Sequence, residues 1–265
     1  MREDRIVNTL REVREVLNKY KVEFWLDSGA LLGAIREGKL IPWDHDIDLG
    51  AWYKDLDKII DACKELKSRG FVIDSLVCEK GEEAITVNVD RKREYPIVIE
   101  LHKVKNDMLV RKNLQNLGFD KETRLRQLFR RGLKYTVWVL SRPSFVGDNP
   151  KYVPKMVHIA LIKIVLLMPD KMVKFLDNIL SKIIYKLGYI WVEERIPANF
   201  FRKFSTIEFY GMKFKVPCPV EKYLEFRYGK DWKIPKKNWS FSRDDGAFSY
   251  LRSEKAILKE SGKDK

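Results

Sequence analysis

Three aspartates at alternate positions, Asp44, Asp46 and Asp48, constrain this chain more than any other feature of its sequence. Alternate side chains of an extended chain point to one face, so the three carboxylates share one side of a strand predicted over about residues 46–52. The alternate residues His45, Ile47 and Leu49 point to the other side, and the two apolar ones among them are expected to lie in a core. Like charges on one face repel one another, and carboxylate oxygens are ligands that Mg²⁺ or Mn²⁺ prefers. The pattern therefore predicts a metal-binding cleft.

A turn and a short helix precede these acids. We predict a strand over residues 22–26, a turn at Ser28 and Gly29, and a helix over about residues 30–37. Ser28 is expected to be the N-cap of this helix, and Gly29 allows a close backbone approach. The free N–H groups at a helix N-terminus bind phosphate. A phosphate cradle followed about seventeen residues later by metal ligands resembles the nucleotidyltransferase fold.

Two motifs narrow the resemblance to one family. Residues 26–50, LDSGALLGAIREGKLIPWDHDIDLG, look like the core motif of the LicD family, which includes bacterial phosphocholine transferases and fukutin-related ribitol-phosphate transferases. Residues 216–217 (VP), residues 223–232 (YLEFRYGKDW) and Pro235 resemble the ending typical of the same family. The two motifs stand in the family's order, about 170 residues apart.

The resemblance implies an enzyme that moves a phospho-alcohol group, such as phosphocholine or ribitol-phosphate, from a CDP-linked donor. The acceptor is a hydroxyl of a glycan or a lipid-linked sugar, and CMP is released. A carboxylate cluster serves nucleotidyl transfer equally well, so an enzyme that adds NMP from an NTP to a small molecule, a protein or RNA is the alternative. A non-enzymatic adaptor that has kept the fold is a second alternative, against which the intact acids argue.

The metal ligands are predicted from the strands. Asp46 and Asp48 lie within the predicted strand and are the strongest candidates, whereas Asp44 stands at its mouth and could bind a second metal ion, the substrate or the loop backbone. The nucleotidyltransferase resemblance implies a third acid on a neighbouring strand. Glu100 lies within an apolar strand and fits that place, as a metal ligand or as the base for the acceptor hydroxyl, with Asp90 as its rival.

Further residues are predicted to line the cleft. Ser28, Gly29, Gly33 and Arg36 are expected to bind the donor phosphates, although Arg36 fits equally well as a surface arginine. His102 alternates with Glu100 and could reach the same cleft.

The charge of the chain is concentrated in its middle. The net charge is +14, and residues 101–150 carry eleven Lys and Arg against four Asp and Glu. Basic helices are predicted over about residues 121–140, 155–168 and 170–187. Such helices can lie on an anionic membrane or dock on the catalytic core with solvated lysines. A nucleic-acid partner is the least expected, because the region carries no nucleic-acid-binding motif.

The predicted fold class is α+β, with a nucleotidyltransferase-like mixed sheet flanked by helices and a basic helical insertion. We divide the chain into a catalytic core at residues 1–105, a basic helical region at 106–200 and a C-terminal hairpin and helix at 201–265. The chain shows no apolar leader and no run of about 20 apolar residues that would span a membrane. Three cysteines without paired spacing argue against a zinc site or disulfides. These features predict a cytoplasmic protein, peripheral on a membrane at most.

Overall fold

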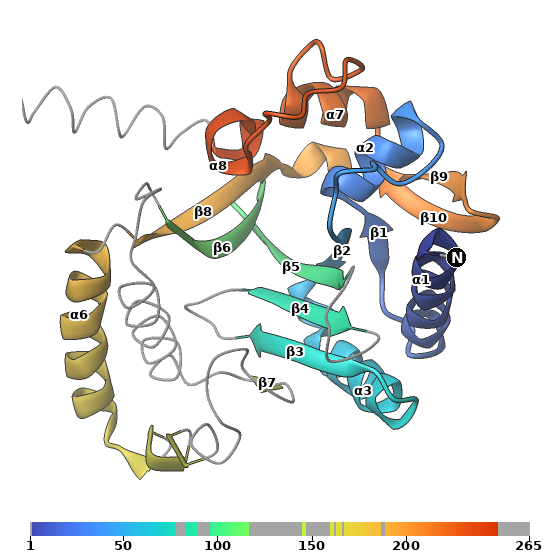
Figure 1. The fold of residues 1–265 in the computed structure, drawn as a ribbon. Coiled ribbons are helices and arrows are strands. Elements are labelled where there is room, and N and C mark those ends of the chain that lie inside the picture. Colours follow the sequence, from blue (N-terminus) through green and yellow to red (C-terminus); the bar gives the residue numbers. More distant parts are fainter. Residues whose placement is uncertain are drawn as a thin grey trace, which may run out of the picture.

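A mixed β-sheet flanked by helices runs through the molecule, as the computed structural model shows (Figure 1). The structure describes residues 2–77, 83–88, 96–116, 145–146, 160–161, 163–165, 167–186 and 189–248. Its helices are α1 (Arg2–Lys19), α2 (Ser28–Arg36), α3 (Leu56–Ser68), α6 (Asp170–Lys186), α7 (Val220–Tyr228) and α8 (Phe241–Asp244). Three 3₁₀ turns are η1 (Tyr53–Asp55), η2 (Ala198–Phe201) and η3 (Gly246–Phe248). The predicted α+β class is therefore confirmed.

The strands join segments that are far apart in the sequence. They are β1 (Phe24–Leu26), β2 (Ile47–Trp52), β3 (Val72–Val77), β4 (Glu83–Asn88), β5 (Ile97–Lys105), β6 (Met108–Asn116), β7 (Phe145–Val146), β8 (Tyr189–Pro197), β9 (Phe204–Phe209) and β10 (Met212–Pro217). Their order across the sheet is β7-β3-β4-β5-β2-β1-β10-β9, while β6 pairs with the end of β5 and with β8. The C-terminal hairpin thus pairs with the first strand, since β10 lies parallel to β1.

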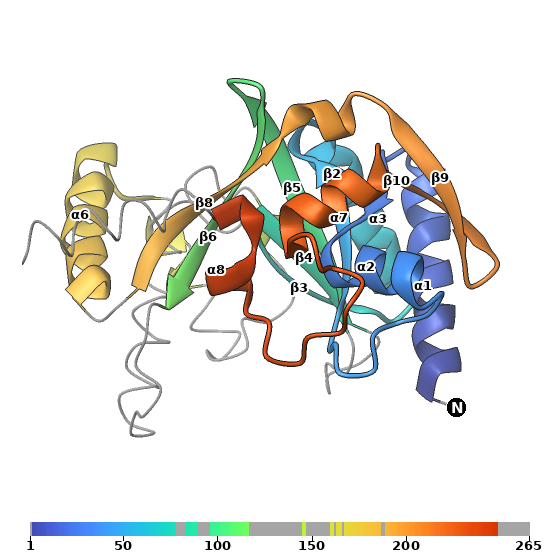
Figure 2. The ribbon, with the colours of Figure 1, turned by 90° about the horizontal axis from the view of Figure 1, so that it is seen from above.

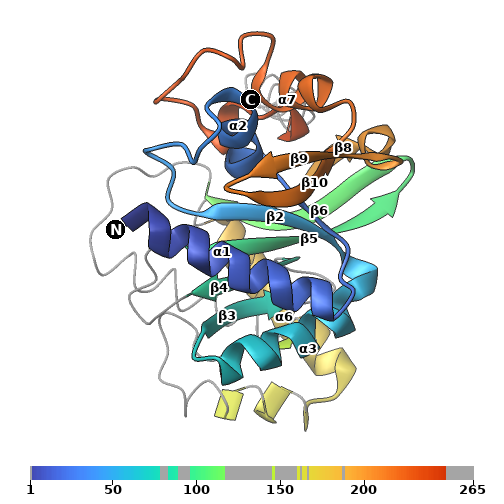
Figure 3. The same ribbon diagram turned by 90° about the vertical axis from the view of Figure 1, so that its right-hand side faces the viewer.

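The two central strands separate the core from the polar face. β2 and β5 are parallel, with Asp48 beside Val98 and Gly50 beside Glu100. One face of this pair carries fully buried apolar residues, which are Ile47, Leu49, Ala51, Ile97, Ile99 and Leu101. Helices α1 and α3 lie side by side on one face of the sheet (Figure 3). Acidic residues occupy the opposite face of β2 and β5, because side chains alternate along a strand.

Helices α2, α7 and α8 gather at one end of the molecule, where the chain's early and late segments meet (Figures 1 and 2). Trp25 links the N-cap of α2 to Gly50 of β2. The Trp25 indole N–H donates to Asp27 Oδ2 at 3.0 Å, and its ring covers Gly50 so closely that a Cβ there would overlap the ring. This close approach requires glycine at position 50.

The strands predicted over residues 22–26 and 46–52 and the helices predicted over residues 30–37 and 170–187 are confirmed within two residues, and the predicted C-terminal hairpin is β9–β10. Strands β6 and β8 are not foreseen, because neither residues 108–116 nor residues 189–197 show a clear period-2 pattern. The helix predicted over residues 121–140 lies outside the described residues, and the three-part domain division stays a prediction.

No helix in the part of the chain that the structure describes combines the length and apolar character needed to cross a membrane.

A substitution at Gly50 tests the close packing of the Trp25 ring against β2. Gly50→Ala is expected to lower the free energy of unfolding by about 1–3 kcal/mol, because the added methyl group displaces the Trp25 ring. Gly38→Asn is the control, since Gly38 has a positive φ of 67° and open space around its α-carbon, and Asn tolerates that conformation. Denaturant unfolding measures both. Equal stability of the two variants would contradict the close packing at Gly50.

Candidate active site

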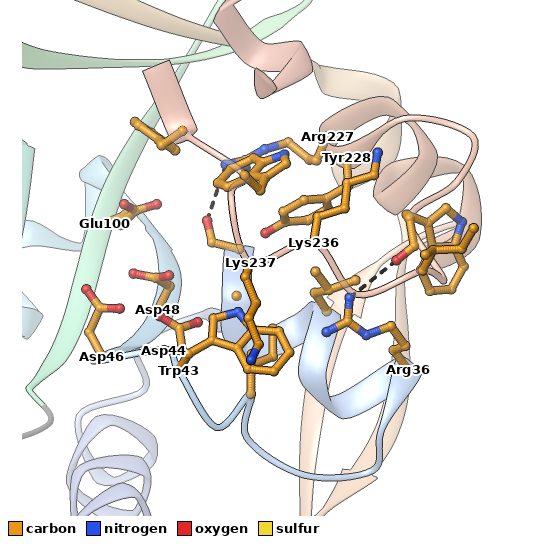
Figure 4. Close-up of a pocket in the computed structure, with 18 of the residues that line it drawn as sticks. Arg36, Trp43, Asp44, Asp46, Asp48, Glu100, Arg227, Tyr228, Lys236 and Lys237 are labelled. Atoms are coloured by element: carbon orange, nitrogen blue, oxygen red, sulfur yellow. Dashed lines mark hydrogen bonds between the residues drawn. The ribbon is translucent and has the colours of Figure 1, made fainter. Parts of the chain in front are cut away.

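A cavity of about 490 Å³ lies between the acidic face of β2 and the segment that follows α7 (Figure 4). Its acidic wall consists of Asp44, Asp46, Asp48 and Glu100. The cations in its lining are Arg36, Arg111, Arg227, Lys236 and Lys237. Its aromatic lining comes from Trp43, Tyr228, Trp232, Trp239 and Phe241. An acidic wall faces basic and aromatic side chains, so the cavity can bind a metal ion together with an anionic ligand.

Crowding and burial raise the pKa values of the acids of this wall. Burial, with repulsion from Asp44, raises the pKa of Asp46 to about 6. Burial and repulsion from Glu100 raise the pKa of Asp48 well above its usual value. Burial raises the pKa of Glu100 to about 8, although the Arg111 guanidinium opposes this shift. A divalent cation bound by these oxygens would offset the repulsion, so the residues present fit a metal ion.

The start of α2 differs from the prediction. Asp27, not Ser28, is the N-cap, because the Asp27 carboxylate accepts a 2.7 Å hydrogen bond from the Ser28 N–H. The predicted N-cap was therefore wrong by one residue, and Ser28 instead opens the helix with a φ of 45°. Its hydroxyl accepts a hydrogen bond from Arg227 at 3.3 Å. Ser28 and Gly29 both line the cavity, so the helix N-terminus does reach the predicted cleft.

The two glycines of α2 have different neighbours. A Cβ on Gly29 would overlap the Asp44 carboxylate, so this glycine allows Asp44 to lie against the helix N-terminus. A Cβ on Gly33 would lie 2.6 Å from the backbone carbonyl oxygen of Lys39. Gly33 is absent from the cavity lining among the described residues. The structure therefore gives Gly33 a packing role against the loop after α2 in place of the predicted contact with the donor.

Arg36 lines the cavity but already contacts other protein groups. It forms an ion pair with Glu37 at 2.6 Å, and its Nη1 lies 3.5 Å from the backbone oxygen of Trp232. Its side chain is only 8% exposed, which excludes the surface arginine considered from the sequence. Arg36 thus links α2 to the segment after α7, as the dashed line in Figure 4 shows.

Behind the cavity, Arg227 is the centre of a buried charge network. Its side chain is fully buried and lies 2.7 Å from Asp245 and 3.1 Å from Glu194. It also donates to the Tyr223 hydroxyl at 2.9 Å, and that hydroxyl in turn donates to Asp27. One guanidinium therefore holds together the α2 cap, β8, α7 and the residue that precedes η3.

A second buried arginine connects this network to the acidic wall. Arg111 Nη2 lies 2.8 Å from Glu100 Oε1 and 2.7 Å from Glu194 Oε2. Burial opposes the charge on Glu194, but Arg111 and Arg227 together hold its pKa at about 2, below the usual value. The other oxygen of Glu100, Oε2, is buried without a hydrogen-bond partner among the described residues. It lies 4.0 Å from His102 Nε2.

His102 lies deeper than predicted. It is buried behind Glu100 and is absent from the cavity lining within the described ranges. Burial lowers the pKa of His102 to about 4, so the ring is neutral at pH 7. Its Nε2 lies 3.8 Å from Asp27 Oδ2 and 4.0 Å from Glu100 Oε2.

This buried Asp–Glu–His group could bind a metal ion, because its ligand atoms lie within 4.8 Å of one another. Asp46 and Asp48 are outside it, so the cavity wall and this group are two distinct arrangements that share Glu100. Only the cavity wall is open to a substrate. The rival third acid, Asp90, lies outside the described residues.

The residues of the buried network carry little signal in the sequence. Arg227 stands within the second family motif, and that position was its only signal. Asp245 stands between Asp244 and Gly246, a setting typical of a surface turn, yet it is fully buried against Arg227. Arg111 and Glu194 occur among other charged residues and carry no pattern that separates them from surface side chains.

Comparison with known proteins identifies similar domains. Residues 21–129 match the family model described as LicD/FKTN/FKRP, nucleotidyltransferase domain. Human ribitol 5-phosphate transferase FKRP is 44% identical over 73 residues, which cover 28% of this chain and 14% of that protein. Human ribitol-5-phosphate transferase FKTN is 26% identical over 241 residues, which cover 88% of this chain and 34% of that protein.

A bacterial protein is similar as well. Lipopolysaccharide cholinephosphotransferase LicD of Haemophilus influenzae is 35% identical over 63 residues, which cover 23% of this chain and 24% of that protein. The matched segments span about a third or less of the length of these three relatives.

The raised pKa values predict a pH-dependent effect of metal. In the metal-free protein, Asp46, Asp48 and Glu100 bind protons more tightly when folded than when unfolded. The free energy of unfolding is therefore expected to fall as the pH rises from about 4 to about 8. Mg²⁺ should raise the melting temperature by at least about 2 °C more at pH 8 than at pH 5.5, where protons compete for the same oxygens.

Differential scanning calorimetry with and without Mg²⁺ measures this effect. Asp48→Asn is expected to remove most of the difference between the two pH values. An equal rise in melting temperature at both pH values would contradict a metal site on these acids.

The buried network makes a separate prediction about stability. Arg227→Met should cost about 3–5 kcal/mol, because it leaves Asp245 and Glu194 buried without this partner. Arg243→Met is a matched control, since Arg243 forms a 2.8 Å ion pair with Asp244 at the surface. Surface pairs contribute about 0–1 kcal/mol. Chemical denaturation compares the two variants, and similar losses would show that Arg227 is not the centre of the network.

Proposed function

We propose that this chain, whose residues 21–129 match the nucleotidyltransferase domain of the LicD family, is a metal-dependent phosphotransferase. It moves a phospho-alcohol group from a CDP-linked donor to a hydroxyl of a glycan or a lipid-linked sugar. The activities named for the three relatives, transfer of ribitol 5-phosphate and of cholinephosphate, support this reaction class. The proposal depends most on one observation, the wall of four carboxylates that faces cationic side chains across the cavity.

The cavity suits a donor that carries a diphosphate. Lys236 and Lys237 line the cavity together with the acids and can neutralise phosphate charge (Figure 4). Trp43 beside them is 38% exposed, and its ring lies 5.6 Å from the Lys237 Nζ. A flat ring beside a cation can stack on a nucleobase while the lysine contacts the phosphates. Ser28 and Gly29 at the start of α2 line the same cavity. The Ser28 N–H donates to Asp27, so the Gly29 N–H in the first turn is the one that can bind an anion.

The proposed metal ion would be Mg²⁺ or Mn²⁺, held by Asp46, Asp48 and Glu100 with Asp44 at the mouth of the site. When bound, it would neutralise the charge that develops on the departing CMP. Three observations support this assignment. The acids line one wall, their pKa values are raised by crowding and burial, and Glu100 Oε2 has no hydrogen-bond partner in the described part of the chain.

The reaction requires a base near the acceptor. The acceptor oxygen would form a bond to the distal phosphorus of the donor while the bond from that phosphorus to CMP breaks, and CMP would leave with the electron pair. The proton of the acceptor hydroxyl would pass to a carboxylate of the wall. Glu100 is the candidate in the arrangement in which it is the base and not a metal ligand, because its Oε2 has no hydrogen-bond partner among the described residues. Arg111 at 2.8 Å orients that carboxylate. Positioning and electrostatics would supply most of the catalysis.

We also propose that the enzyme works in a reducing, cytoplasmic setting on acceptors presented at a membrane, such as lipopolysaccharide or teichoic-acid-like polymers. Cys63 and Cys218 are free thiols, which supports a reducing compartment.

Release of CMP tests the proposed reaction. Purified protein would be incubated with Mg²⁺ and CDP-choline, CDP-ribitol, CDP-glycerol or CDP-ethanolamine, with and without membrane glycolipid. We expect one donor to yield CMP, and Asp46→Asn and Asp48→Asn to lower the rate at least about a hundredfold. Asp107→Asn is the control, because the Asp107 side chain is 92% exposed and lies outside the cavity lining.

The same assay distinguishes the proposed phosphotransfer from nucleotidyl transfer. Release of pyrophosphate from CTP or ATP, lost in the same two variants, would identify a nucleotidyltransferase and overturn the proposal. Unchanged CMP release by Asp46→Asn and Asp48→Asn would exclude the acidic wall as the site.

A further inference from the structure

Exposed apolar side chains are concentrated on one part of the surface. Among the described residues, nine large apolar side chains are exposed, and six of them fall between residues 164 and 183. They are Ile164, Leu167, Met172, Phe175, Ile179 and Ile183, and we call this surface the α6 face. Two of these side chains, Leu167 and Phe175, are 86% and 63% exposed. An exposed apolar patch of this kind marks an interaction surface.

The four members within α6 form a stripe along the helix. Met172, Phe175, Ile179 and Ile183 are spaced by three, four and four residues, which places them within about 80° of one another at 100° per residue. The neighbouring side of the helix is turned toward the protein, because Val173 is buried. Leu176 and Leu180 on that side are half-buried. The apolar side of α6 is therefore wider than the part that the rest of the protein covers.

Lysines accompany this stripe. Lys171 and Lys182 lie beside Phe175 on the helical wheel, and Lys174 lies farther round. All three are exposed, as is Lys163 in the turn of helix before α6. Long lysine side chains can extend alongside a buried apolar stripe and keep their ammonium groups in water. An apolar stripe flanked by lysines is complementary to a surface that has an apolar interior and an outer layer of negative charge.

We propose that the α6 face binds the surface of an anionic lipid bilayer. The helix, 17 residues long, would lie flat in the plane of the headgroups with its stripe among the acyl chains. Figure 1 shows α6 at the margin of the molecule, away from the strands that carry the acidic wall. The active-site cavity would stay open to an acceptor when α6 is bound, because α6 contributes no residue to its lining. The inference stands on α6 alone and does not require the proposed reaction.

Vesicle co-sedimentation tests the proposal with the full chain. Vesicles of phosphatidylcholine would be compared with vesicles that contain about 30% phosphatidylglycerol. We expect binding to the anionic vesicles, and a loss of at least about tenfold in the partition coefficient for Phe175→Glu/Ile179→Glu. The triple variant Lys171→Gln/Lys174→Gln/Lys182→Gln should weaken binding to anionic vesicles, and about 0.5 M NaCl should do the same to the unaltered protein.

A matched control separates the α6 face from exposed apolar residues in general. Val104→Glu adds the same charge at a side chain that is 60% exposed on the hairpin β5–β6, and it should bind vesicles like the unaltered protein. Thermal unfolding checks that the variants fold, which we expect because the substituted residues are exposed. Equal binding by Val104→Glu and Ile179→Glu, or no binding by the unaltered protein, would overturn the proposal.

Self-association is the other outcome. A dimer in light scattering that Ile179→Glu dissociates, without vesicle binding by the unaltered protein, would assign the α6 face to a second copy of this chain. Activity on a soluble acceptor should be unchanged by Ile179→Glu, so failure of the membrane proposal would leave the proposed reaction untouched.

Discussion

The contact between Arg227 and its acidic partners is the interaction on which the rest of the structure depends. The guanidinium is fully buried, and its partners Asp245, Glu194 and Asp27 come from three other segments of the chain. A buried ion pair need not add stability, but an arginine without its partners in this position would be strongly unfavourable. The network therefore specifies one arrangement, in which β8, α7 and the last described residues close against the start of α2.

That arrangement supports the acidic wall. Arg111 bridges Glu194 and Glu100, so the network behind the cavity fixes one oxygen of Glu100 and leaves the other without a hydrogen-bond partner among the described residues. Gly29 lets Asp44 lie against α2, and Trp25 covers Gly50 while it donates to the α2 cap. The repulsion among the acids is sustained because positive charge lies behind them and rigid packing lies beneath them.

The local parts of the fold could be predicted from the sequence because they follow short-range periodicity. Alternation placed Asp48 and Glu100 on a face opposite the core residues Leu49 and Ile99, and the structure agrees. The N-cap of α2 was predicted one residue late, because Asp27 and Ser28 are both good capping residues and only the geometry distinguishes them. His102 was expected near the cleft. Alternation predicts on which face of the strand a side chain lies, but it does not predict how deeply that side chain is buried.

The sequence by itself determined the resemblance to the LicD family, the acidic strand and the helix before it, because these depend on residue spacing within a short segment. Only the tertiary structure decided which charged residues are buried. Asp27, Arg111, Glu194, Arg227 and Asp245 are spread over more than two hundred residues and resemble surface residues in the sequence. Their burial follows from the pairing of β10 with β1 and of β6 with β8. Local propensity does not encode such long-range contacts, since they form only when distant segments bury one another's charges.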